Sequence, residues 1–232
     1  MNIRTLVLLC LGIFAVSHTS AQTFSDNGFA NTDWTGTKIN DTTAGQSATF
    51  TASQTLTGGN PGAFRETTMS YGVGNILVAD LNSNFTYNLA TQGAIDSISY
   101  SYDLNAFTTG ISGAIGYDLL VYQDNSYYVS NIEDVSTANS WVNFSHDGLL
   151  APDFTLVDGA GPTHPDFSTS GSNLTFGFAS GNGTAFGTGF TDSGLDNFSL
   201  TVATPEPSTW AMLLSGLGLL AFWRYHTRRA QG

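Results

Sequence analysis

The chain has 232 residues, with six Lys and Arg against 18 Asp and Glu, and a formal net charge of −12 at pH 7. Residues 22–203 alone hold fifteen Asp and two Glu against Lys38 and Arg65, a net charge of −15. This acidic balance excludes a nucleic-acid-binding protein, which needs a basic footprint for the phosphate backbone. The same stretch is long enough for one domain with its own core.

The N-terminus has the layout of a secretory signal peptide. Arg4 precedes an apolar run over residues 6–16, and small residues follow. Residues 19–21, Thr-Ser-Ala, fit a small-x-small cleavage rule, which predicts a signal peptide over residues 1–21 and a mature start at Gln22. Residues 15–17 offer an alternative cleavage site. The Sec machinery is therefore the expected export partner.

Residues 22–203 contain few helix-forming residues and many Gly, Ser, Thr, Asn and aromatic residues. Short alternating runs bounded by Gly, Asn, Asp or Pro predict an all-β fold, an antiparallel jelly-roll-like β-sandwich. After a first strand and loop at 24–34, the predicted strands cover residues 46–56, 63–71, 73–79, 85–89, 95–104, 116–123, 127–131, 141–146, 174–178 and 196–202.

The clearest strand is residues 95–104, where Ile98, Tyr100, Tyr102 and Leu104 fall on one face. Residues 116–123 and 127–131 form a predicted hairpin around the turn residues 124–126. Residues 147–172 hold three Pro, four Gly and four Asp, and predict one long loop.

No residue set in this stretch has the pattern of a catalytic site. Glu66 and Glu133 are its only Glu residues, His146 and His164 lack zinc spacing, and no Gly-x-Ser-x-Gly sequence is present. We therefore expect a protein that is not an enzyme.

Four aromatic residues are candidate ligand-binding platforms, because a flat ring can stack on a sugar. They are Trp34, Tyr127, Tyr128 and Trp141. The alternative for each is a place in the core. Because Tyr127 and Tyr128 are adjacent, one of the two should face outward from a regular strand.

The C-terminal segment contains an uncharged apolar run over residues 208–223. As a helix it spans about 24 Å, whereas the hydrocarbon core of a bilayer measures about 30 Å. The run therefore predicts a short transmembrane helix. Arg224, Arg228 and Arg229 follow it directly and predict a cytoplasmic C-terminus.

Pro205-Glu206-Pro207, the apolar helix and the terminal Arg cluster together resemble the PEP-CTERM sorting signal of Gram-negative bacteria that produce exopolysaccharide. The resemblance implies recognition and processing by an exosortase, a membrane cysteine protease. It implies export through the inner membrane, with the helix held there transiently, and delivery to the cell surface or extracellular matrix. The expected organisation is a signal peptide at 1–21, a β-sandwich domain at 22–203 and the sorting signal at 204–232.

A second resemblance covers most of residues 24–202. Gly28-Phe29 followed by Trp34, the Gly-Asn-Pro-Gly of residues 59–62, and the final Leu-Asp-Asn-Phe-Ser-Leu of residues 195–200 are similar to laminin-G-like and carbohydrate-binding jelly rolls.

That resemblance implies a structural calcium ion at the start of the final strand. Asp196 matches the expected position, and Asp26 or Asn27 would lie close to it if the two ends of the domain pair. Oxygen ligands of this kind suit calcium. Ala30 stands where the family pattern usually has Glu.

The sequence thus predicts a secreted, exosortase-processed surface or matrix protein that is non-catalytic and binds exopolysaccharide. One alternative is a purely structural surface or adhesion protein. The other is a secreted polysaccharide hydrolase, for which two carboxyl groups would have to face each other in a cleft.

Overall fold

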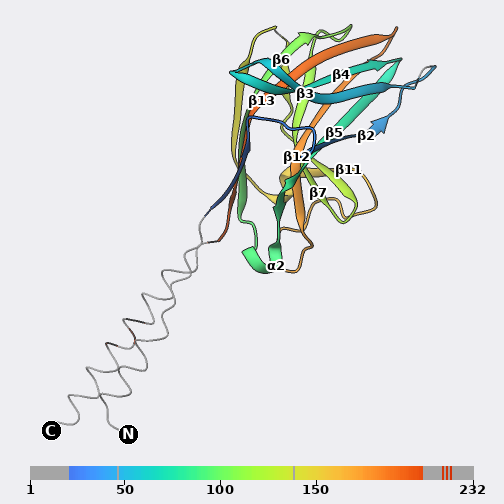
Figure 1. The fold of residues 1–232 in the computed structure, drawn as a ribbon. Coiled ribbons are helices and arrows are strands. Elements are labelled where there is room, and N and C mark those ends of the chain that lie inside the picture. The colour runs from blue at the N-terminus through green and yellow to red at the C-terminus, as the bar shows by residue number, and fades with distance from the viewer. Residues whose placement is uncertain are drawn as a thin grey trace, which may run out of the picture. The chain divides into compact units, whose positions relative to one another are not determined.

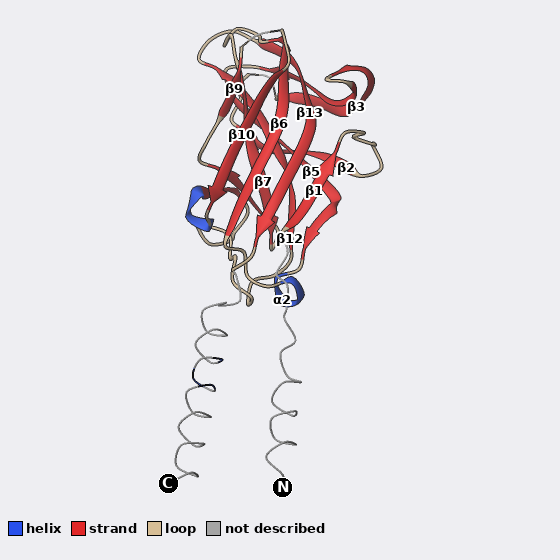
Figure 2. Ribbon diagram, turned by 90° about the vertical axis from the view of Figure 1, so that its left-hand side faces the viewer, coloured by secondary structure: helices blue, strands red, loops and turns tan. Residues whose placement is uncertain are grey.

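A computed structural model describes residues 21–45, 47–137 and 139–205, together with Gly216, Gly218 and Leu220. Residues Ala21–Thr204 form one compact unit, built almost entirely of strands (Figures 1 and 2). The predicted signal peptide and transmembrane helix lie almost entirely outside the described residues, as do Glu206, Pro207 and the three C-terminal Arg residues. Among the residues described, no helix is long and apolar enough to cross a membrane.

The unit is a sandwich of two antiparallel sheets, which confirms the predicted all-β, jelly-roll-like class. Sheet A has the order β10-β6-β13-β4-β3, with β1 paired to β13. Its strands are β1 (Gln22–Asp26), β3 (Thr49–Gly59), β4 (Gly62–Tyr71), β6 (Ser97–Thr108), β10 (Val142–Leu149) and β13 (Gly189–Ala203). Sheet B has the order β11-β8-β7-β12-β5-β2, with β9 paired to β7. Its strands are β2 (Trp34–Asp41), β5 (Gly74–Tyr87), β7 (Ile115–Gln123), β8 (Ser126–Ser130), β9 (Asp134–Ser136), β11 (Phe154–Asp158) and β12 (Leu174–Thr184).

The predicted hairpin is confirmed as β7 and β8. Asp124 and Asn125 both adopt positive φ, at 50° and 56°. Two left-handed residues in a two-residue turn match the right-handed twist of the flanking strands. Asp and Asn tolerate this conformation better than most residues.

Several strands differ from the prediction, among them β2, β5 and β13. The strand β2 begins at Trp34 and continues with the mostly polar sequence Thr-Gly-Thr-Lys-Ile-Asn-Asp. This sequence lacks the apolar alternation that predicts a strand. The strand β5 is continuous where two shorter strands were predicted. The strand β13 begins at Gly189 rather than at 196, because its Ser- and Gly-rich first half pairs with β4 through backbone hydrogen bonds.

The single long loop predicted at 147–172 is wrong in part. The strand β10 continues to Leu149, a 3-10 turn follows at Ala151–Asp153, and β11 then forms from Phe154 to Asp158. The Asp153 carboxylate accepts the Leu150 N–H at 2.7 Å. Phe154 is fully buried and secures β11 against the core.

One short helix, α2 (Leu89–Gln92), was not predicted. The side chain of Asn88 accepts the N–H of Thr91 at 3.1 Å and caps the helix N-terminus. Figure 1 shows α2 at one end of the sandwich.

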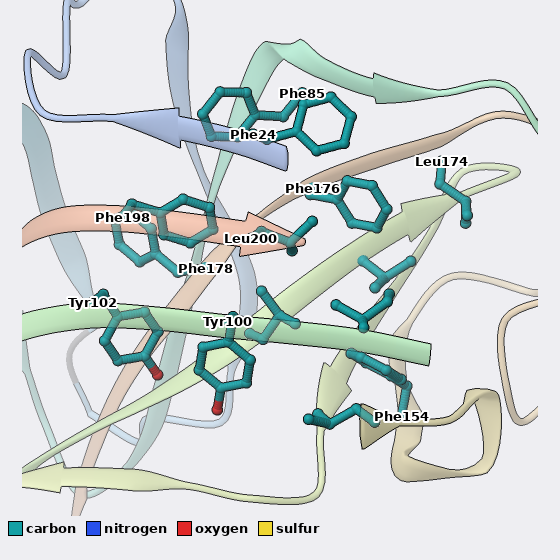
Figure 3. Packing of buried hydrophobic residues seen from close by; sticks show 14 of the residues in the cluster. Phe24, Phe85, Tyr100, Tyr102, Phe154, Leu174, Phe176, Phe178, Phe198 and Leu200 are labelled. Atoms are coloured by element: carbon teal, nitrogen blue, oxygen red, sulfur yellow. The ribbon is translucent and has the colours of Figure 1, made fainter. Parts of the chain in front are cut away.

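The core lies between the sheets and is rich in aromatic rings (Figure 3). Phe198 of sheet A stacks on Phe85 of sheet B with ring centroids 5.7 Å apart. Phe24 meets Phe176 across the same interface at 5.6 Å. Tyr100 and Tyr102 occupy the predicted inner face of β6 and are buried. Close aromatic pairs of this kind add to the stability that burial alone provides.

An ion pair also joins the two sheets inside the sandwich. Arg65 of β4 is 2% exposed, and its Nη2 lies 2.8 Å from Oδ1 of Asp80 on β5. The Arg65 Nη1 donates to Oδ1 of Asn31 at 2.9 Å. Arg65 is therefore buried and paired with a carboxylate.

A second buried carboxylate, Asp134 of β9, connects the sheets near β10. It accepts the hydroxyl of Tyr102 at 2.7 Å and that of Tyr100 at 3.2 Å. The Nε2 of His146 lies 2.7 Å from its other oxygen. Every oxygen of Asp134 thus has a protein partner, which indicates a structural role.

Candidate functional site

The outer face of sheet B has a floor of small residues along β12. Gly177, Ala179, Gly181 and Gly183 alternate with residues that point into the core, such as Phe178. Ala179 belongs to a small apolar cluster that is separate from the main core. Ile39, Ala79 and Leu120 are the other buried members of that cluster. The small residues of β12, together with Ala79 beside them on β5 and Gly116 on β7, leave room above one part of the sheet.

A cavity of about 750 Å³ occupies one end of this face. It lies where β5 and β7 begin and β12 ends. Its lining includes Asn40, Asn75, Gly116, Glu133, Gly181 and Gly183.

Two of the floor glycines have a polar side chain lying across them. A Cβ added at Gly116 would come within 2.0 Å of the Glu133 Oε1. A Cβ added at Gly183 would come equally close to the Asn75 Oδ1, at 2.0 Å. The missing side chains therefore let Glu133 and Asn75 fold into the cavity.

Asn182 fixes one wall of the cavity. Its Nδ2 donates to the Ala114 carbonyl at 2.6 Å, and its Oδ1 accepts the Ser112 hydroxyl at 2.7 Å. The same oxygen accepts the Gly183 N–H at 2.6 Å. These bonds hold the connection that precedes β7 against the end of β12, so that the wall is preformed.

The side chains of Asn40, Asn75 and Glu133, which also line the cavity, are not held in place as that of Asn182 is. All three residues are exposed, and within the described parts of the chain none of their side chains makes a hydrogen bond. Two amides and a carboxylate thus offer donors and acceptors to the cavity.

Asp118 lies on the same outer face of β7 as Gly116, two residues along the strand. Burial raises the pKa of Asp118 to about 7, and the nearby carboxylates of Glu133 and Asp134 add to the effect. No described residue donates a hydrogen bond to Asp118. Glu133 lines the cavity, whereas Asp118 lies beside it on β7. The cavity and this adjacent part of the outer face of β7, together called the groove, therefore carry two carboxyl groups with no cationic partner among the described residues.

An exposed aromatic ring stands at the rim. Phe186 is 70% exposed and follows Ala185, which lines the cavity. The hydroxyl of Thr184 donates to the Phe186 carbonyl at 2.7 Å, and the Phe186 N–H donates back to that hydroxyl at 3.2 Å. The turn is thus fixed while the ring faces solvent.

Among the predicted platforms, only Tyr127 lies on this face. It is half-buried, and its ring centroid is 4.8 Å from that of Tyr122. Tyr128 points the other way and is 1% exposed. One residue of the pair therefore faces outward, as the alternation of a strand requires, but Tyr128 is a core residue and is not available for stacking.

The prediction for Trp34 also needs correction. Trp34 is 3% exposed and packs against Phe178 and Phe198. Its indole N–H donates to Oδ2 of Asp26 at 2.7 Å. A sugar ring cannot reach it.

Trp141 is half-buried on the outer face of sheet A, away from the cavity. Its ring packs edge-on against Phe64 at 5.4 Å, and its indole N–H donates to the Gly58 carbonyl at 3.0 Å. The turn that begins at Gly58 leads to Asn60, which contacts Asp196. The structure thus brings Trp141 and Asp196 to one region.

The carboxylates predicted to hold calcium accept hydrogen bonds from the protein, and a calcium ion at this place stays a prediction. The Asp26 Oδ1 accepts the N–H groups of Gly28 and Phe29 at 2.6 and 3.0 Å, and its Oδ2 accepts Trp34. The Asp196 oxygens accept the N–H groups of Asn60 and Asn197. Asn27 makes no side-chain hydrogen bond with a described residue.

Each carboxylate oxygen of Asp26 and Asp196 is therefore already bonded to a protein donor. No three His, Cys, Asp or Glu side chains of the described residues are arranged to hold a metal ion.

The sequence did not indicate Asn40, Asn75, Glu133 and Phe186 as site residues. One signal was available: small residues at every second position from Gly177 to Gly183 indicate a strand face without side chains. The polar residues themselves lie on three different strands or strand ends, and only the pairing of those strands brings them together.

Comparison with known families identifies the PEP-CTERM protein-sorting motif at residues 203–229. The match includes Pro205, Glu206, Pro207 and the C-terminal Arg residues, and confirms the sorting signal predicted from them. No curated protein matches the chain.

Several solved structures are similar in their strand arrangement. A family 11 carbohydrate-binding module from Clostridium thermocellum, in complex with a β-1,3-1,4-mixed-linked tetrasaccharide, has a TM-score of 0.45 and 12% identity, over 79% of this chain and 96% of that one. The CBM22-1 xylan-binding domain of Paenibacillus barcinonensis Xyn10C has a TM-score of 0.41 and 14% identity, over 81% and 95%. A protein of unknown function from Shewanella oneidensis MR-1 has a TM-score of 0.41 and 9% identity, over 90% and 97%.

At scores this low the likeness carries no argument about function. The sorting motif does carry one about location. The chain bears a PEP-CTERM protein-sorting motif and is exported across the inner membrane to the cell surface or extracellular space.

Proposed function

We propose that the β-sandwich is a non-catalytic glycan-binding module, displayed at the cell surface after exosortase processing. The observation that carries this proposal is the cavity on the outer face of sheet B, with Phe186 exposed at its rim. Three polar side chains around the cavity make no hydrogen bond with any residue that the structure describes.

This combination suits a sugar. Amide and carboxylate groups can form the paired hydrogen bonds that neighbouring hydroxyls require, and an aromatic ring can cover the apolar face of a pyranose. A cavity of this size is in the range that holds a small ligand. Because Asn182 fixes the wall and glycines form the floor, little ordering should be needed on binding.

The position of the cavity is also suitable. Thr184 pairs with Gly74 at the cavity end of sheet B, and Leu174 pairs with Tyr87 at the opposite end. The strand β13 runs from Gly189, just after the turn at the cavity rim, to Ala203 at the opposite end. The sorting motif begins at that residue. The cavity thus faces away from the point where the domain joins the sorting segment.

Binding can be tested with the purified full-length chain in neutral detergent, titrated with exopolysaccharide from the producing host. Phe186→Ala should weaken binding about tenfold, since packing of an aromatic ring against the apolar face of a sugar contributes on the order of 1 kcal/mol or more. Asn40→Ala combined with Asn75→Ala should weaken it further. Leu56→Ala is the matched control, because Leu56 is 71% exposed but lies on sheet A.

Equal affinity of the Phe186 variant and the wild type would contradict the site. Loss of binding in the Leu56 variant would show that the affinity comes from general apolar contact. If the domain binds no glycan, the proposed binding module is rejected.

Processing is tested separately. Changing Pro205, Glu206 and Pro207 to Ala should leave an unprocessed precursor in a host that has the sorting enzyme, seen as a longer species on immunoblots. Normal processing of this variant would reject the role of the motif.

A secreted glycan hydrolase is the second candidate, because Asp118 and Glu133 place two carboxyl groups in one groove. Glycosidases use such a pair, with the pKa of one group raised. The binding-module proposal predicts no release of reducing ends from the bound glycan. Release that disappears in Glu133→Gln would establish the hydrolase instead.

A further inference from the structure

The charges around the groove narrow the class of glycan that it can bind. Glu133 lies over Gly116 inside the cavity, and Asp118 follows on the same face of β7. Neither carboxyl group receives a hydrogen bond or an ion pair from the described residues. The two groups instead act on each other, since Glu133 is among the charges that affect Asp118.

The cations of the described domain are committed elsewhere. Lys38 lies 2.5 Å from the carboxylate of Asp41 and also donates to the Ala48 carbonyl at 2.9 Å. Arg65 is buried against Asp80. Among the described residues, no Lys or Arg is therefore free to pair with an acidic sugar, and recognition of carboxylate groups generally depends on such a cation.

A cationic ligand would reduce the repulsion between the carboxylates of Glu133 and Asp118. Two like charges in a partly desolvated site disfavour ionisation of each other. An ammonium group placed between them would favour both ionised forms and would replace part of the lost hydration. The nearby amides of Asn40 and Asn75 would remain available for hydroxyl groups.

We propose that the groove selects a glycan that carries protonated amino groups, held by Glu133 and Asp118, and rejects glycans rich in uronic acid. The inference rests on the proposed glycan-binding function and names the ligand class of that same site.

The test compares three oligosaccharides of equal length, titrated calorimetrically into the full-length chain in neutral detergent. They are a glucosamine oligomer, the matching N-acetylglucosamine oligomer and an oligogalacturonate. They are compared over a range of pH up to about 7, because the amino groups must be protonated while Asp118, whose pKa is about 7 without ligand, must ionise. The glucosamine oligomer should bind at least tenfold more tightly than its neutral counterpart. The oligogalacturonate should show no binding.

Variants separate the groove from the general negative charge of the domain. Glu133→Gln and Asp118→Asn should each weaken glucosamine binding at least fivefold and leave N-acetylglucosamine binding within about twofold of the wild type. Asp147→Asn is the matched control, because it removes the same charge at an exposed position of β10 in sheet A. It should change neither affinity. A polyamine of equal charge without sugar should bind more weakly than the glucosamine oligomer.

Equal affinity for the glucosamine and N-acetylglucosamine oligomers would overturn this inference and leave the binding module intact. An equal loss in the Asp147 variant, or equally tight polyamine binding, would show diffuse electrostatic attraction and would also overturn it. Failure of all three oligomers and of the host polysaccharide would reject the proposed function itself.

Discussion

The two outer faces of the sandwich carry the same kinds of polar side chain in opposite states. On sheet A, carboxylates and amides form a closed network, whose members are Asn60, Asp103, Asn143, Asp196 and Asn197. On sheet B, four polar side chains in or beside the cavity make no hydrogen bond with a described residue, and these are Asn40, Asn75, Asp118 and Glu133. The first set is saturated by protein donors, whereas the second is available to a ligand.

The difference has a cause in the backbone. Asn197 has a φ of 51° and lies within a register shift of β13. This turns its side-chain amide toward Asp103, to which it donates at 2.6 Å. On sheet B, β7 and β12 pair beside the cavity without a register shift, although β2 shifts its register between Lys38 and Asn40. Glycines there replace side chains that could have supplied donors. Irregular backbone thus closes one network, and missing side chains leave the other open.

The buried ion pair of Arg65 and Asp80 lies in the interior, and breaking it should cause the largest loss of unfolding free energy. Arg65→Ala would leave Asp80 buried without its cation, which typically costs about 3–5 kcal/mol of unfolding free energy. Urea denaturation would measure the loss. Lys38→Ala breaks a half-exposed pair and should cost less than about 1 kcal/mol. A similar loss in both variants would show that burial does not distinguish the two pairs.

This contrast also separates what the sequence could predict from what it could not. The alternation of Ile98, Tyr100 and Tyr102 fixes one face of β6 whatever its neighbours are, and the prediction was confirmed. The same holds for the turn at Asp124 and Asn125. Local patterns of this kind depend only on the strand that carries them.

The state of a polar side chain depends on its partners, which the sequence does not place. Asp196 could be assigned to the final strand, but its bonds come from Asn60 and Asn197 across a register shift. Trp34 and Trp141 have the same chemistry, yet one lies in the core and the other on the surface of sheet A. The cavity required the pairing of β5, β7 and β12, and no local pattern contains that information.

Asp118 on the outer face of sheet B should make the unfolding free energy depend on pH. The pKa of Asp118 is about 7 in the folded protein, against about 3.9 in an unfolded chain. A raised folded pKa contributes stability at low pH that is lost as the pH rises through about 7. The shift corresponds to an upper limit of about 4 kcal/mol, and relaxation of the groove should reduce it to roughly half.

Asp118→Asn should therefore flatten the fall in unfolding free energy between about pH 4 and pH 7. The difference between wild type and variant isolates this group, because Asp192 also has a raised pKa, of about 6, and acts in the same direction. If the curves of unfolding free energy against pH are parallel for the two proteins, Asp118 is in contact with solvent. It would then not belong with the other polar groups near the cavity on sheet B.

A matched pair of truncations compares the two faces directly. Asp196→Ala leaves the N–H groups of Asn60 and Asn197 without their acceptor and should cost about 2 kcal/mol. Asn75→Ala removes an exposed side chain without a protein partner and should change the unfolding free energy by less than about 0.5 kcal/mol. Equal losses would mean that the cavity residues are structural after all, which would weaken the proposed site.

The smallest expected effect concerns calcium. Because each oxygen of Asp26 and Asp196 already accepts a protein hydrogen bond, an added ion would compete with those N–H donors for the same oxygens. Calcium or a chelator should therefore shift the melting temperature of the full-length chain by less than about 2 °C, well below the shift expected for saturation of a tight site. A larger rise that disappears in Asp196→Ala would show that the ion can replace the N–H donors of Asn60 and Asn197. The closed network of sheet A would then be a second ligand site, and the contrast between the two faces would concern which ligand each one takes.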